Sequence, residues 1–270
     1  MSQVMKVPRA SLRTTTGRAI RLRLPVGSLS LLAGALVWES VARAVHISFL
    51  PPLSAVIARL AQMTADGEIL RSLGSSLINL AIGFTFSAVV GVGLGLLMGA
   101  YRKVEAALDM YVYALLTAPS LVFAPIFFSI FGLGRAPIVG VIIMNSIFII
   151  IINTADAVRS VPRPLIEMAR SFCANDHQVS RRIVVPAAMP LIMAGLRLGM
   201  VRAVKGMVTG EMFIAVVGLG AIVMNAGRRF DTESILAVLL VVILVAFLAT
   251  KLVRLVDQRV NRWLPSTSRS

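Results

Sequence analysis

The chain is poor in the residues on which disulfide-linked domains, metal centres and soluble domains depend. Its 270 residues include one cysteine and two histidines, and only 14% of them are charged. One cysteine excludes a disulfide framework, and so few cysteines and histidines make a Cys/His metal cluster implausible. Charged residues make up about a quarter of a typical soluble domain, so the composition also excludes that class.

Sequence motifs of catalysis are missing as well. There is no glycine-rich loop followed by Lys and Ser or Thr, no His-Glu-x-x-His pair and no nucleophile elbow. We therefore expect a chain that is not an enzyme and that holds no metal or cofactor of its own.

Apolar sequence and positive charge are abundant. Hydrophobic residues make up 57% of the chain, and the formal net charge is +15. A nucleic-acid-binding protein gathers its basic residues on a polar surface. Here they lie between apolar runs of about 20 residues, the length that spans a bilayer. We predict an all-α, polytopic membrane protein, a transmembrane helical bundle with no nucleic-acid partner.

Six apolar segments are predicted to cross the membrane, roughly 27–45, 77–100, 111–131, 137–155, 188–217 and 235–256. In the third segment, Pro119 and Pro125 each lack a backbone donor, so we expect that helix to be kinked or broken. Glycines spaced by four residues on the second and fifth segments favour close helix packing within the chain, with a subunit interface as the alternative.

The distribution of basic residues predicts the topology. Eighteen Lys and Arg residues lie in the N-terminal tail, the loops 101–110 and 156–187 and the C-terminal segment, against six on the opposite side. Because Lys and Arg near spans are retained in the cytoplasm, both termini are predicted to be cytoplasmic. The first segment also resembles a cleavable signal peptide, but Trp38, Glu39 and Arg43 crowd the cleavage region, so a retained helix is favoured.

The longest segment on the outer side, 46–76, is predicted to contain an amphipathic helix. Ser54 is placed to cap it, and Val56, Ile57, Leu60 and Met63 share one face. Two interpretations remain open, a helix lying at the membrane interface and a docking surface for an external partner.

The polar segment 167–199 reads EMARSFCANDHQVSRRIVVPAAMPLIMAGLRLG. It resembles the cytoplasmic "EAA" loop of ABC-transporter membrane subunits, in which a short helix docks into a groove on the ATP-hydrolysing subunit. Met168 replaces the first alanine of that pattern and Cys173 replaces its glycine. The matching residues are Glu167, Ala169, Arg170, Ile183, Pro186, Pro190, Gly195, Leu196 and Arg197. The resemblance implies that ATP and magnesium are bound by a partner subunit.

Six residues are the candidates for coupling to that ATPase: Glu167, Ala169, Arg170, Phe172, Cys173 and Pro186. We expect Ile166, Ala169 and Phe172 to fill the partner groove, with Phe172 as the main anchor, and Glu167 to pair with Arg170. The alternative is a solvated loop helix with local charge pairs.

The residue at the glycine position of the loop raises a conformational question. Cysteine tolerates a positive φ poorly. Either Asn175 takes the left-handed conformation in its place, or Cys173 extends a helix.

Further stretches narrow the resemblance to one importer branch. Residues 50–56 look like its "LPSPSAV" element, 72–84 like its "SLxRxxxGF" element, and Gly210-Glu211-Met212 like its "xEM" element. The branch comprises the permeases for nitrate, sulfonates, taurine, bicarbonate and thiamine-pyrimidine precursors. The resemblance covers about residues 37–264 and implies a type I ABC importer permease of the inner membrane.

The resemblance also implies partners and a domain organisation. The partners are an ABC ATPase subunit, a second permease copy in a homo- or heterodimer, and an extracytoplasmic substrate-binding protein. The expected organisation is a basic tail over 1–26, a permease domain over 27–264 with its coupling loop at about 156–187, and a tail over 265–270.

Ionisable residues in the fifth apolar segment are candidates for a solute pathway. A charge at membrane depth costs about 2.5–3.5 kcal/mol on insertion scales unless it is paired or faces water. Lys205, Thr209 and Glu211 are therefore pathway candidates for an anionic solute, and a salt bridge from Lys205 to Glu39 or Glu211 is the structural alternative. For the function as a whole, the alternative is an ion-coupled secondary carrier or channel.

Overall fold

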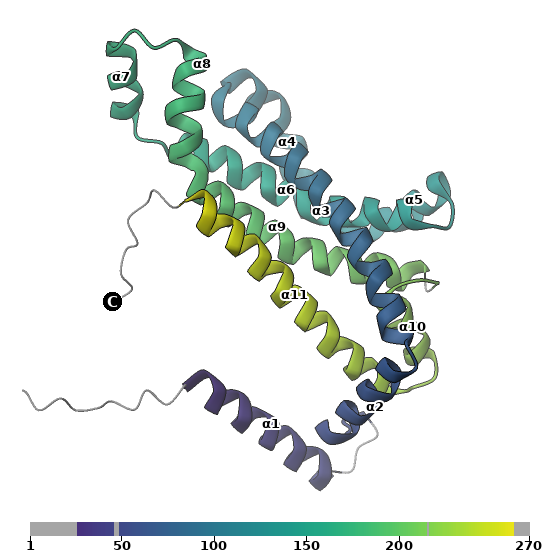
Figure 1. Cartoon of the computed structure of the whole chain (residues 1–270). Helices are drawn as coiled ribbons and strands as arrows, with labels where there is room; N and C mark the ends of the chain where they lie inside the picture. The colour runs from purple at the N-terminus through teal and green to yellow at the C-terminus, as the bar shows by residue number, and fades with distance from the viewer. Residues whose placement is uncertain (1–25, 46–48, 215, 262–270) are drawn as a thin grey trace, which may run out of the picture.

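The computed structural model describes residues 26–45, 49–214 and 216–261, and within these ranges the regular structure is helical throughout (Figure 1). The elements are α1 (Val26–Val45), α2 (Leu53–Ala65), α3 (Glu68–Ala100), α4 (Arg102–Thr117), the 3-10 turn η1 (Ser120–Phe123), α5 (Ala124–Phe131), α6 (Arg135–Arg159), α7 (Arg163–Ser171), α8 (Asp176–Val179), the π-helical turn η2 (Ser180–Val184), α9 (Val185–Ile214), α10 (Leu219–Arg228) and α11 (Thr232–Val260).

Four helices of the described ranges are long and apolar enough to cross a membrane. They are α3, α6, the continuous helix Asp176–Phe213 that joins α8 to α9, and α11. These correspond to the second, fourth, fifth and sixth predicted spans. The first predicted span is helical as α1 but is not among the four, so the count of six stays a prediction.

The third predicted span is broken, as its prolines indicated. α4 and the following η1–α5 segment are bent by 94° at the break, so together they make at most one further span. Ala118 and Pro119 are extended at the bend, because the residue before a proline avoids the helical region. Pro125 lies in the first turn of α5, where its missing donor costs nothing.

The core is built on α6, which is packed closely by α3 on one side and by α9 on another. Glycines of both neighbours lie where the α6 side chains approach: Gly83, Gly91, Gly95 and Gly99 of α3, and Gly195, Gly199 and Gly206 of α9. At Gly95 an added Cβ would lie 2.5 Å from the Thr154 Cβ and 2.6 Å from the Ile151 carbonyl oxygen. Small residues permit such close approach in membrane helices, so the predicted role in packing within the chain is confirmed.

The predicted amphipathic helix of the outer segment is α2, and its apolar face packs against the bundle. Val56 and Met63 are buried in the main hydrophobic cluster with residues of α9 and α11, and Leu60 is half-buried against it. Ile57 is exposed, and Ser54 does not cap the helix. The Ser54 hydroxyl instead donates to the Glu39 carboxylate at 2.9 Å, which ties α2 to α1.

α1 extends away from the other helices and contacts the rest of the described chain near α2 (Figure 1). The Trp38 indole donates to the Pro51 carbonyl at 3.1 Å, and Arg43 lies 2.6 Å from Glu39. Glu39 is therefore paired within this corner of the structure.

The packing of α3 on α6 makes a testable prediction. Gly95→Ala should lower stability by about 1–3 kcal/mol, the usual cost of overpacking, because its Cβ meets backbone and a β-branched side chain. Gly93→Ala is the matched control, since an added Cβ there meets nothing within 4 Å. Thermal unfolding of the purified variants in detergent measures the difference, and equal midpoints for the two would contradict this account of the core.

Candidate functional site

The loop between α6 and α9 contains the short helix α7, and the turns at both ends of this helix are well defined. Pro162 precedes this helix, and Pro164 lies in its first turn, where proline is favoured. At its other end, the Cys173 amide donates to the Arg170 carbonyl at 2.9 Å and the Ala174 amide to the Ala169 carbonyl at 3.2 Å. These two bonds are the Schellman arrangement that ends a helix on a left-handed residue.

Cys173 is that left-handed residue, with φ of 56°. Both expectations for this position are therefore wrong, because the turn is neither displaced to Asn175 nor replaced by helix. The chain keeps the turn where the family pattern has glycine.

Asn175 has a different role, as the N-cap of α8. Its side chain accepts from the Gln178 amide at 2.9 Å, and the Gln178 side chain accepts from the Asn175 amide at 3.0 Å. This is a capping box, and the Asn-x-x-Gln spacing was the sequence signal for it. From this cap, the helix continues through the η2 π-turn into α9, so the loop is joined to a membrane span without a break.

The exposed apolar face of α7 differs from the predicted one. Phe172 is 81% exposed, and Met168 and Leu165 join it on the surface. Ala169 is buried and Ile166 is half-buried, so these two residues pack inward. The spacing i, i+3, i+7 of the exposed set is that of one helix face.

The charged residues of the loop also differ in their pairing. Arg170 lies 3.2 Å from Asp176, and both side chains are exposed. Glu167 is exposed and forms no ion pair within the described ranges, so the predicted Glu167–Arg170 pair is absent there. Pro186 lies in the first turn of α9 and is half-buried. Of the six coupling candidates, Glu167, Arg170, Phe172 and Cys173 are on the loop surface, while Ala169 and Pro186 are packing residues.

Glu211 is held at the opposite end of α9, completely buried. Its carboxylate accepts hydrogen bonds from the Ser76 hydroxyl at 2.8 Å, the Asn79 amide at 3.4 Å and the Gly220 backbone N–H at 3.1 Å. Ser76 in turn accepts from the Leu219 N–H at 3.0 Å. The carboxylate thus accepts from the Gly220 amide of α10 directly and is linked to the Leu219 amide through Ser76, at the helix N-terminus where a negative charge is favoured.

The chain turns tightly around this carboxylate. Gly218 has φ of 89°, and an added Cβ there would lie 2.2 Å from the Glu211 carboxyl carbon. Glu211 is thereby fixed between α3, α9 and α10 and does not lie on the exposed face of α9 with the other pathway candidates.

That exposed face carries two cations, Arg202 and Lys205. The Thr209 hydroxyl lies on the same face and donates to the Lys205 carbonyl at 2.8 Å. In the part of the chain that the structure describes, neither cation forms an ion pair, since Glu39 is paired with Arg43 and Glu211 is bonded as above. The salt-bridge alternative for Lys205 is therefore wrong.

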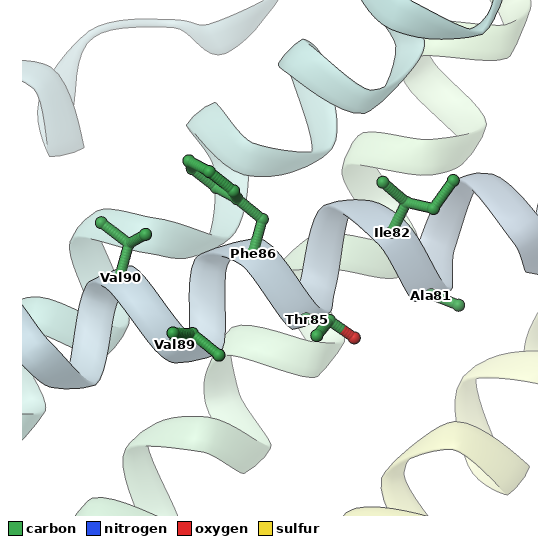
Figure 2. A pocket seen from close by; sticks show the side chains of 6 residues that line it. All are labelled: Ala81, Ile82, Thr85, Phe86, Val89 and Val90. Atoms are coloured by element: carbon green, nitrogen blue, oxygen red, sulfur yellow. The ribbon is translucent and has the colours of Figure 1, made fainter.

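One hollow along α3 has the wrong chemistry for a charged solute. It measures about 690 Å³ and is lined almost wholly by hydrocarbon, with the Thr85 hydroxyl as its polar exception (Figure 2). Its lining residues are Ala81, Ile82, Thr85, Phe86, Val89 and Val90. Exposed cations lie instead on α9, at Arg202 and Lys205.

Comparison with known proteins agrees with the resemblance of the sequence to ABC-importer permeases. The profile of the family described as "Binding-protein-dependent transport system inner membrane component" matches residues 91–262. The chain is 32% identical to the riboflavin transport system permease protein RibX of Chloroflexus aurantiacus, over 97% of this chain and 99% of that protein. It is 28% identical to the taurine transport system permease protein TauC of Escherichia coli, over 90% of each.

The fold also has a solved neighbour. An inward-facing structure of the MetNI methionine ABC transporter contains a chain that superposes with a TM-score of 0.63 at 19% sequence identity. The match covers 71% of this chain and 95% of that chain. At this identity the likeness concerns the fold alone.

The left-handed cysteine of the loop makes a prediction. Cys173→Gly should stabilise the loop by about 1 kcal/mol, because a left-handed conformation costs a residue with a Cβ roughly 1–2 kcal/mol. Cys173→Ala is the matched control, since it removes the thiol and keeps the Cβ. Hydrogen exchange at the amides of Cys173 and Ala174 measures the local effect, and equal protection in the Gly and Ala variants would refute the assignment of strain.

Proposed function

The chain belongs to the family of binding-protein-dependent transport system inner membrane components, and on that premise we propose how its loop and its charged helix face perform transport. It is the permease subunit of an ABC importer for a small solute, a transport component of the inner membrane. This assignment overrides the alternative of an ion-coupled secondary carrier.

The exposed face of α7 is the surface on which a separate ATPase subunit docks. Phe172, Met168 and Leu165 supply an apolar contact that stays exposed among the described residues, and the exposed Glu167 and Arg170 set its register. ATP and magnesium bind in the partner, and this chain contributes no catalytic group. The observation that carries the proposal is the 81% exposure of Phe172 at the C-terminal end of α7, where two backbone hydrogen bonds fix the turn.

Continuity of the helix links the docking surface to the solute pathway. The run from Asp176 to Phe213 passes without a break from the loop to the face that carries Lys205. A displacement of α7 by the ATPase therefore moves this face, and such movement alternates access between the two sides of the membrane.

Arg202, Lys205 and Thr209 line the pathway, which is formed with a second permease copy or a paralogue. Cations without a counter-ion do not face hydrocarbon, because the cost at membrane depth is several kcal/mol. A water-filled path between two copies removes that cost, and its positive potential favours anions. We propose a small anionic solute of the sulfonate, taurine or nitrate kind, in keeping with relatives named for aliphatic sulfonates and taurine.

The remaining parts of the proposal concern topology and delivery. Both termini are cytoplasmic, so the loop at about 156–187 faces the ATPase, and α2 and α10 lie at the outer end. An extracytoplasmic substrate-binding protein delivers the solute to that end. The permease domain extends over about 27–264, and the mainly basic tails flank it.

The docking face is tested by Phe172→Asp. Burial of an aromatic anchor contributes about 2 kcal/mol or more at such interfaces, so the charged variant should lose most of the ATPase on co-purification or hydrolyse ATP without transport. Phe230→Asp is the matched control for ATPase co-purification alone, because Phe230 is 80% exposed at the other end of the molecule, away from α7. Coupled transport at the wild-type rate by Phe172→Asp would disprove the docking role.

The pathway is tested by Lys205→Met in reconstituted vesicles. The variant should be expressed normally, because Lys205 has no partner to strand in the described structure, and it should import taurine or a sulfonate several-fold more slowly. Lys251→Met, at an exposed cation near the end of α11, is the control. Wild-type uptake of these anions by a well-expressed Lys205→Met protein would eliminate the pathway role.

A further inference from the structure

The end of α10 carries an exposed aromatic residue next to two arginines. Phe230 is 80% exposed, and Arg228 and Arg229 before it are exposed as well. They lie in the turn between α10 and α11, at the end of the molecule away from α7 (Figure 1). No side chain of the described structure covers Phe230, since four-fifths of it is open to the surroundings.

The backbone holds this aromatic residue in an unusual conformation. The Phe230 amide donates to the Gly227 carbonyl at 3.2 Å, and the Asp231 amide donates to the Ala226 carbonyl at 3.0 Å. This is the same helix ending as that of α7, and it places Phe230 in the left-handed region with φ of 55°. That region is unfavourable for a bulky residue and is expected to hold glycine.

The turn is fixed to two neighbouring helices. The Asp231 carboxylate caps α11, accepting from the Ser234 amide at 3.0 Å and the Ser234 hydroxyl at 2.6 Å. Arg59 of α2 donates to the Ser234 hydroxyl at 2.8 Å and lies 3.6 Å from Asp231. Partial burial acts to raise the pKa of Asp231, but the bonds from Ser234 and the charge of Arg59 outweigh it and lower the pKa, so the cap stays ionised at neutral pH.

The charge of this turn is also unusual for its position. In the predicted topology only six Lys and Arg residues lie in the outer segments, and Arg228 and Arg229 are two of them, adjacent in sequence. The nearest carboxylate in sequence, Asp231, is hydrogen-bonded to Ser234 and lies close to Arg59, and the charge of Arg229 acts on it as well. A partner at this surface therefore meets two guanidinium groups and one aromatic ring, presented on a rigid turn.

We propose that Arg228, Arg229 and Phe230 form a docking surface for the extracytoplasmic substrate-binding protein, whose contact face carries carboxylates beside an apolar pocket. Aromatic and arginine side chains are the types that dominate binding energy at protein interfaces. The outer rim charges steer association, and a rigid aromatic residue loses little entropy on binding. This inference rests on the proposed function, since it assigns the outer turn to a partner which that function requires.

The test uses the full importer in nanodiscs and the fluorescently labelled substrate-binding protein of the same system. Arg228→Glu/Arg229→Glu should raise the Kd of association at least tenfold and should flatten its dependence on salt. Lys251→Glu/Arg254→Glu, which makes the same charge change at the other end of α11, should leave the Kd within twofold of the wild-type value.

Phe230→Gly separates docking from folding. Glycine adopts the left-handed conformation without strain, so thermal stability of the permease should stay the same or rise, while the Kd for the binding protein rises at least tenfold. A purely structural role for Phe230 gives the opposite pattern, lower stability with unchanged affinity.

Three outcomes would overturn the inference. Association of both variants within twofold of the wild type would refute this surface alone and leave the proposed function standing. Loss of affinity for vesicles of anionic lipid, with protein association unchanged, would make the surface a lipid contact. Failure of the wild-type importer to bind the substrate-binding protein at all would refute the proposed function and this surface together.

Discussion

The close approach of α3 and α9 to α6 is the constraint on which the rest of the molecule depends. In a membrane, helices gain little from excluding lipid, so their association depends on packing and on hydrogen bonds. The glycines of α3 and α9 let side chains of α6 lie against backbone, and a bond of 2.9 Å from Ser146 to Ser87 adds a polar contact inside that packing. The ends of these helices are thereby fixed, and the loops at both ends of the bundle are built on them.

Each end of the bundle has a helix that ends in a turn with a left-handed residue and an exposed aromatic ring. At one end, α7 is followed by the left-handed Cys173 beside the exposed Phe172, and at the other end α10 is followed by Phe230, which is itself left-handed and exposed. The buried Glu211 carboxylate holds the start of α10 against α3, and the capping box of Asn175 holds the start of α8. Rigid turns that expose apolar groups are suited to partners, because little entropy is lost when such surfaces bind.

Local sequence predicted what depends on local chemistry. The long apolar runs predicted six spans, and four of them are helices long and apolar enough to cross a membrane in the described ranges. Pro119 predicted the break in the third, because the effect of proline on the backbone is local. The partners of Glu211 could not be predicted, because Ser76 and Asn79 lie 135 and 132 residues away in the chain. Which side of α7 faces inward depends on the packing of this helix against the following turn. The left-handed conformation of Cys173 depends on two backbone hydrogen bonds, which outweigh the preference of cysteine for a negative φ. The capping box at Asn175 could have been predicted from the Asn-x-x-Gln spacing, but it was not.

The helix from Asp176 to Phe213 also has a mechanical consequence. Its 38 residues follow a helical path of about 57 Å at 1.5 Å per residue, and the path changes direction between α8 and α9 (Figure 1). The contacts of Gly195, Gly199 and Gly206 with α6 lie partway along α9 and act as its fulcrum. The 30 residues of α9 span about 45 Å, so a tilt of about 6° shifts one of its ends relative to the other by roughly 5 Å, close to one helical turn. A small rotation at the loop is thus sufficient to change the width of the proposed solute pathway beside this helix.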